Sequence, residues 1–107
     1  MATSLLRPLT LLFLLFASLA GAAPALAATT AQEVQTSWRL LDYIAVDYRE
    51  AVADGKVINP LEYDEMLEFS STVSDKLAAL PVRPEKPALV DSAGKLEAAI
   101  AAKADPA

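Results

Sequence analysis

The sequence predicts an all-α fold, in which a signal-peptide helix precedes an antiparallel helical hairpin and a third, weakly amphipathic helix. Apolar residues recur every three or four positions through two long stretches, about 30–54 and 60–80, as they do on one face of a helix. A strong helix-start signal separates these stretches. Neither stretch shows the alternation of apolar and polar residues that is typical of a strand. A third stretch, about 88–103, repeats the spacing with smaller side chains.

Residues 1–27 have the pattern of a secretory signal peptide. Arg7 precedes an uncharged run from Leu9 to Ala20, and Ala25–Ala27 places small residues where a signal peptidase reads them. The run is shorter than the ~20 residues that span a bilayer, so an uncleaved anchor is the weaker alternative. Cleavage would leave 80 residues with no further run of membrane-spanning length, and we expect an exported, periplasmic protein.

The helix expected over about 30–54 carries an apolar stripe. Its members are spaced 4, 3, 4, 3 and 4 residues apart: Val34, Trp38, Leu41, Ala45, Tyr48 and Val52. We expect this stripe, including the Trp38 ring, to face the core. Gly55 follows as the expected left-handed C-terminal cap of the helix.

The second helix has the clearest start signal in the chain. Asn59 suits the N-cap, Pro60 the first helical position, and Glu62 stands at the capping-box spacing. Only three residues separate Gly55 from Asn59, so the two helices should fold back on each other as a hairpin domain, residues 28–80.

Three prolines among residues 81–87 predict an extended linker. The helix expected after it, within a C-terminal segment 88–107, has a thin apolar face formed by Leu89, Ala93, Leu96 and Ile100. It either docks on the hairpin or acts as a spacer. The last four residues carry no cap signal, which we interpret as a mild indication of truncation.

Composition excludes several classes of function. The chain has no Cys and no His, so it has no disulfide, Cys zinc site or c-type haem attachment, and it lacks the commonest general base. A net charge of −5 disfavours nucleic acid as a partner, because phosphates are bound chiefly by Lys and Arg. A helical hairpin also offers little concavity for a catalytic carboxylate pair, and we expect no enzyme.

Carboxylates are the one group of side chains suited to metal chemistry. The candidate metal ligands share helix faces at spacings of three and four residues: Asp47, Glu50 and Asp54 on the first helix, and Glu65 and Glu68 on the second. If the hairpin joins these faces, an all-oxygen site for a hard cation, including iron, would form, with Tyr43 and Tyr63 at its edges. The alternative is an ordinary solvated acidic face.

The amino-acid sequence of the predicted helical hairpin resembles that of a known protein family. The matching segments are Leu40–Tyr48, Asp54–Val57, Glu62–Met66 and Glu68–Phe69. They are similar to the extracytoplasmic N-terminal segment of bacterial high-affinity iron permeases of the Ftr type. Arg49 and Glu50 begin like that family's Arg-Glu-x-x-Glu motif, but Ala53 replaces the final Glu.

The resemblance implies a periplasmic helical module of an iron-uptake system, which binds or presents iron or docks to an iron permease or a c-type cytochrome. The permease membrane helices and a Cys-x-x-Cys-His haem site are missing from this sequence, so the chain is not expected to transport iron by itself. Two alternatives stay open: a structural helical interaction module with no metal binding, and a truncated fragment of a full permease.

Overall fold

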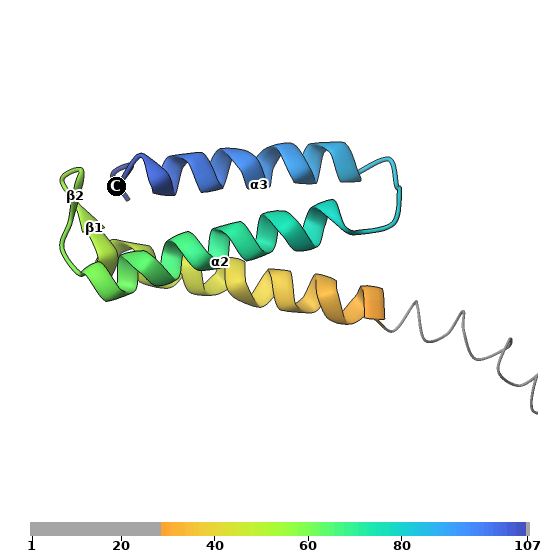
Figure 1. Ribbon diagram of the computed structural model, residues 1–107, viewed down its shortest axis with the longest axis horizontal. Helices are drawn as coiled ribbons and strands as arrows, with labels where there is room; N and C mark the ends of the chain where they lie inside the picture. The colour runs from red at the N-terminus through yellow and green to blue at the C-terminus, as the bar shows by residue number, and fades with distance from the viewer. Residues whose placement is uncertain (1–28, 107) are drawn as a thin grey trace, which may run out of the picture. The chain divides into compact units, whose positions relative to one another are not determined.

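The computed structural model describes residues 29–106 and confirms the all-α class. The elements are the first helix (residues 29–51), β1 (Val52–Ala53), β2 (Lys56–Val57), α2 (Pro60–Ala78) and α3 (Lys86–Ala101) (Figure 1). Contacts divide the chain into two units, Met1–Ala31 and Gln32–Ala107. Residues 29–31, the described part of the first unit, are helical, and the expected signal peptide lies outside the described residues.

A tight β-hairpin, rather than a helix cap, joins the first helix to α2. Val52 pairs with Val57 and Ala53 with Lys56 in antiparallel register. Asp54 and Gly55, between the strands, have φ of 53° and 71°, and positive φ at both central residues is what a type I′ turn requires. The expectation that the helix continues to residue 54 and is capped by Gly55 is therefore wrong.

The predicted start of α2 is confirmed. Asn59 is extended, with φ −141° and ψ 103°, and its side-chain oxygen accepts a hydrogen bond from the Glu62 amide at 3.3 Å. Its carbonyl accepts the first helical hydrogen bond, from the Tyr63 amide at 3.0 Å. Pro60 lies in the first turn, where backbone N–H groups have no acceptor within the helix, so the N–H that proline lacks costs no hydrogen bond.

The third helix docks on α2. It begins at Lys86, two residues earlier than expected, because Pro87 is accommodated in its first turn. The Lys86 ammonium donates to the Leu80 carbonyl at 2.7 Å across the connection. At the other end, the Tyr63 hydroxyl of α2 donates to the carbonyls of Ile100, at 2.9 Å, and Ala101, at 3.3 Å. The spacer alternative does not hold.

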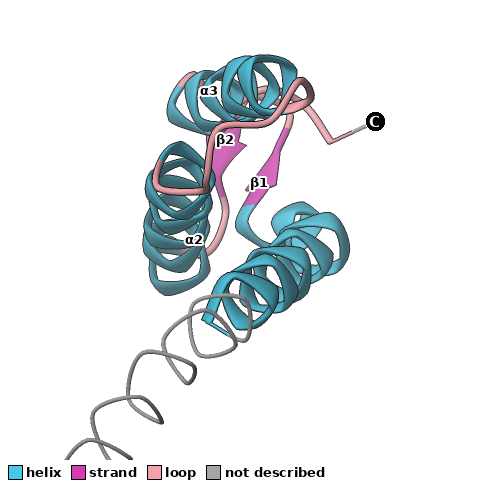
Figure 2. Cartoon of the chain, turned by 90° about the vertical axis from the view of Figure 1, so that its right-hand side faces the viewer, coloured by secondary structure: helices cyan, strands magenta, loops and turns pink. Residues whose placement is uncertain are grey.

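The core lies where the three helices meet the hairpin. Its buried cluster consists of Ile44, Ala51, Val52, Met66 and Ile100. Seen along the helices, α2, α3 and the first helix lie around a common axis with the hairpin at their far end, and no described helix covers the side between α3 and the first helix (Figure 2).

The apolar stripe predicted for the first helix is not its buried face. Ser37, Ile44 and Ala51, each seven residues apart, are at most 5% exposed, whereas Trp38 is 74% exposed. The prediction that Trp38 packs in the core is wrong. Apolar side chains cover a wider sector of this helix than α2 and α3 together bury, so the sequence pattern does not identify which part turns inward.

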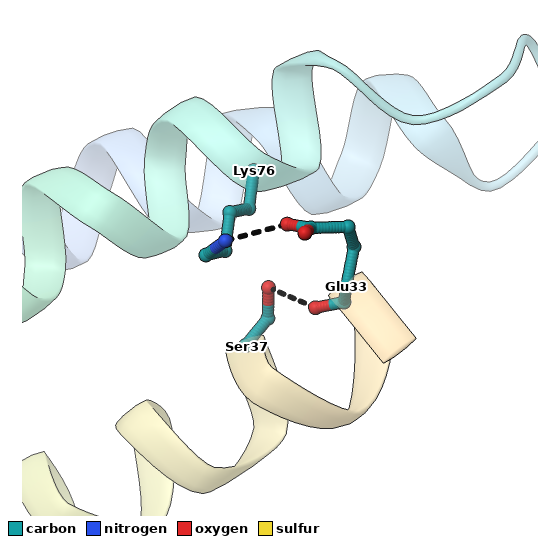
Figure 3. A network of polar contacts seen from close by, with 3 residues as sticks. All are labelled: Glu33, Ser37 and Lys76. Atoms are coloured by element: carbon teal, nitrogen blue, oxygen red, sulfur yellow. Dashed lines mark hydrogen bonds and ion pairs between the residues drawn. The ribbon is translucent and has the colours of Figure 1, made fainter. Parts of the chain in front are cut away.

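An ion pair joins the first helix to α2 far from the hairpin (Figure 3). The Lys76 ammonium lies 2.5 Å from a Glu33 carboxylate oxygen, and the Ser37 hydroxyl donates to the Glu33 carbonyl at 2.9 Å. Ser37 is 3% exposed, and this bond within its own helix satisfies the hydroxyl at that depth.

Candidate functional site

An acidic surface forms where the end of the first helix lies beside the start of α2. The first helix contributes half-buried Asp47 and exposed Glu50, and α2 contributes half-buried Glu62 and exposed Glu65. The N-terminal end of α2 is the positive end of its dipole, which favours acidic residues there.

These carboxylates act on one another electrostatically. The pKa of the Glu62 carboxyl is raised above its usual value, and partial desolvation is the largest cause. The negative charges of Glu65, Asp47 and Glu50 raise it further. The structure thus brings together three of the five residues predicted from sequence. Glu62 was not among the predicted ligands, because its spacing from Asn59 was interpreted as helix capping. Its position three residues before Glu65 also places it on the same face of α2 as Glu65.

Asp54 and Glu68 are the other two predicted ligands. Asp54 is exposed in the hairpin turn, where the chain has left the helical path assumed for it. Glu68 is exposed one turn further along α2. Neither of them contributes to the shift of the Glu62 pKa.

Within residues 29–106, no three carboxylates are arranged so that they could hold a metal ion. Tyr63 directs its hydroxyl to the α3 carbonyls, and the Tyr43 ring packs against Phe69 with centroids 6.0 Å apart. What the surface offers a cation is therefore a region of negative potential to which several neighbouring carboxylates contribute.

A groove of about 690 Å³ opens between the first helix and α3. Its lining is mainly apolar: Ile44, Ala45, Tyr48, Arg49, Leu96, Ala99, Ile100, Ala104, Asp105 and Pro106. The residues from the first helix follow its i, i+4 period, as expected of one helical face. Some of these residues belong to the apolar stripes predicted from the sequence, but the first-helix stripe was predicted to face the core of a helical hairpin.

The chain after α3 closes one end of this groove. Lys103 has φ 56°, and the Ala104 amide donates to the Ala99 carbonyl at 3.0 Å, so the chain turns sharply there, as at a left-handed helix cap. The Tyr48 hydroxyl then donates to the Ala104 carbonyl at 2.6 Å. The pKa of Tyr48 is raised, first by desolvation and then by the nearby Tyr63 and Asp105.

Large apolar side chains remain exposed in the part of the first helix and α3 beyond this lining. Val34 is 47% exposed, Trp38 74% and Leu89 44%. Large apolar side chains that stay exposed are a feature of interaction surfaces.

A comparison with family models agrees with the arrangement of packed helices. The model of the iron permease-associated 4-helix bundle domain matches residues 23–107, which include the whole described part of the chain. No curated protein and no solved structure matches the chain. The match spans most of the sequence and confirms the family resemblance found in the sequence segments between Leu40 and Phe69. The chain belongs to the iron permease-associated four-helix bundle family.

Proposed function

We propose that the chain is an extracytoplasmic helical module of an iron-uptake system, which docks to an iron permease and does not itself transport iron. The family is a permease-associated domain rather than an enzyme family. The observation that carries the proposal is the uncovered apolar groove in a domain of that family. Among the described residues, no helix is both long enough and apolar enough to cross a bilayer. The signal-peptide pattern of residues 1–27 supports export.

Co-purification tests the docking role. The full chain, tagged at its C-terminus, is isolated from detergent-solubilised membranes that contain the organism's iron permease, with an unrelated exported protein as the control. We expect the permease to be recovered with the chain, and iron uptake by cells to fall when the chain is deleted. Unchanged uptake and no recovered permease would refute the proposal. Recovery of a c-type cytochrome without the permease would identify the other partner.

A second candidate function is the collection of iron by the acidic surface. The raised pKa of Glu62 supports it, because a cation bound there would relieve repulsion among the surrounding carboxylates. The candidate ligands are Asp47, Glu50 and Glu65, with Glu62 added from the structure, and Asp54 and Glu68 as the remaining residues predicted from the sequence. Without a preformed cage among the described residues, we expect weak iron binding.

Calorimetric titration with ferrous iron under anaerobic conditions tests this second function. Asp47→Asn combined with Glu50→Gln should abolish the binding heat and leave helicity unchanged by circular dichroism. The matched control, Asp75→Asn with Glu85→Gln, removes the same charge from exposed positions elsewhere and should bind as the unaltered chain does. Equal affinity in both double variants would exclude the acidic surface. No heat with any variant would favour an interaction module without metal.

A further inference from the structure

The chain turns back at the end of α3 in a defined helix-terminating motif. The Lys103 amide donates to the Ile100 carbonyl at 3.0 Å, and the Ala104 amide donates to the Ala99 carbonyl, also at 3.0 Å. These two hydrogen bonds, with a left-handed residue directly after the helix cap, form the Schellman arrangement. The motif sets the direction in which residues 103–106 leave the helix.

The residue at the left-handed position of this motif is an unfavourable one. Glycine is usual there, because the Cβ atom of any other residue is strained at positive φ. This chain instead has Lys103, with φ 56°. The left-handed conformation of Lys103 therefore opposes the turn, and a contact from outside α3 is needed to offset the strain.

Tyr48, on the first helix, supplies such a contact. Its hydroxyl donates to the Ala104 carbonyl at 2.6 Å, and the two residues are 56 positions apart in the chain. Burial raises the pKa of Tyr48, and the nearby charge of Asp105 raises it further, so the phenol stays neutral and able to donate. The turn after α3 is thus held from a different helix.

The segment held by Tyr48 lies against the groove between the first helix and α3. Residues 104–106 form part of the groove lining. Ile44 and Ile100 line the same groove, yet they are only 5% and 2% exposed, whereas Ala45 in the groove wall is exposed. Moving residues 104–106 away would therefore open the groove toward two large apolar side chains.

We propose that residues 103–106 are a strap over the hairpin end of the groove, and that the hydrogen bond from Tyr48 to Ala104 holds this strap closed. Release of the strap lengthens the apolar groove without unfolding a helix. One hydrogen bond favours closure and one left-handed residue opposes it, and these two contributions are of similar size. The strap therefore opens readily, and it regulates access to the groove whichever partner uses it.

Amide hydrogen exchange at Ala104, followed by NMR, measures how often the strap opens. Tyr48→Phe removes the donor and should accelerate this exchange about fivefold, as expected for the loss of one hydrogen bond. Lys103→Gly relieves the left-handed strain and should slow the exchange by a similar factor, after correction for intrinsic rates. Tyr43→Phe is the matched control, because it removes a hydroxyl from the same helix outside the groove and should change neither rate.

Thiol labelling measures whether opening of the strap uncovers the groove, since the chain has no native Cys. Ala99→Cys places a thiol in the groove wall, and Ala98→Cys places one at an exposed position of α3 outside the groove. When each is combined with Tyr48→Phe, the thiol from Ala99→Cys should react about fivefold faster with a soluble disulfide reagent. The thiol from Ala98→Cys should react at an unchanged rate.

Three outcomes would overturn the strap. The first is an exchange rate in Tyr48→Phe equal to that in Tyr43→Phe. The second is faster exchange at Ala104 without faster labelling of the thiol from Ala99→Cys, because the chain would then fray without uncovering the groove. The third is an equal acceleration throughout α2, which would indicate global destabilisation. These measurements need no permease, so a failed co-purification would leave the strap standing, and a failed strap would leave the docking role standing.

Discussion

The first helix meets α2 and α3 in two different ways. Toward α2 the contacts extend along the helix, from the Glu33–Lys76 ion pair to the Tyr43–Phe69 ring pair and the buried Ile44 and Met66. Toward α3 the hydrogen bond lies at the hairpin end, where Tyr48 reaches Ala104, and a groove opens beside it. The closed junction stabilises the domain, whereas the open junction leaves apolar surface available to a partner.

The largest expected loss of stability comes from a substitution in the buried centre of the closed junction between the first helix and α2. Met66 is fully buried, so Met66→Ala should destabilise the domain by about 3 kcal/mol through lost burial and the cavity left behind. Urea unfolding followed by circular dichroism measures the change. If Met66→Ala does not fold, Met66→Leu should fold with a loss below about 1.5 kcal/mol. A loss below about 1 kcal/mol for Met66→Ala would contradict the described core.

Tyr63 is the next test, because its hydroxyl joins α2 to the last turn of α3. Tyr63→Phe removes the donor to the Ile100 and Ala101 carbonyls and should cost about 1 kcal/mol of unfolding free energy. Amide hydrogen exchange should accelerate most at the end of α3. Exchange that changes only in the first helix would show that the hydroxyl does not hold α3.

Alkaline pH should weaken the hydrogen bond from Tyr48 to Ala104, which joins the first helix to the chain after α3. The raised pKa of Tyr48 means that the folded state favours the neutral phenol, which donates to Ala104. This contribution is therefore complete below the unfolded Tyr pKa of about 10 and is lost as pH rises through the higher folded value. Melting temperatures measured from pH 8 upward should fall less for Tyr48→Phe than for the unaltered chain. Identical pH profiles would refute the assignment.

The Glu33–Lys76 ion pair should contribute less than the buried contacts. Both side chains are partly exposed, at 40% and 26%, so Lys76→Met should cost about 0.5 kcal/mol, and less at high salt. Lys95→Met, which breaks the more exposed pair with Asp91, is the control and should change stability less. The comparison requires urea unfolding at low and high ionic strength.

Trp38→Ala should have the smallest effect on folding, since the ring is 74% exposed and lies on the open side. A change below about 0.5 kcal/mol is expected, as for surface substitutions in general. The single Trp also reports its own environment: its fluorescence should be readily quenched by acrylamide in the isolated chain and protected when the permease is bound. A loss of several kcal/mol would place Trp38 in the core after all.

The candidate sites were predictable to different degrees. Helical spacing placed Asp47 and Glu50 on one face, and the structure brings them to Glu65 and Glu62 because the hairpin folds the two helix ends together. Asp54 was misplaced because the Asp54–Gly55 dipeptide, a strong turn signal, was interpreted as the end of a helix. The sequence pattern did not distinguish the groove from the core, because apolar residues that line an open groove and apolar residues that face a core have the same spacing.

The sequence by itself determined the local structure: the helical class, the Asn59 cap and the approximate helix boundaries. These follow from periodicity and capping, which involve residues only a few positions apart. Only the tertiary structure decided that α3 docks through Tyr63, that Ile44 rather than Trp38 turns inward, and that one junction stays open. Which part of a broad apolar sector is buried depends on where other helices lie, and that is set by contacts between residues distant in the chain.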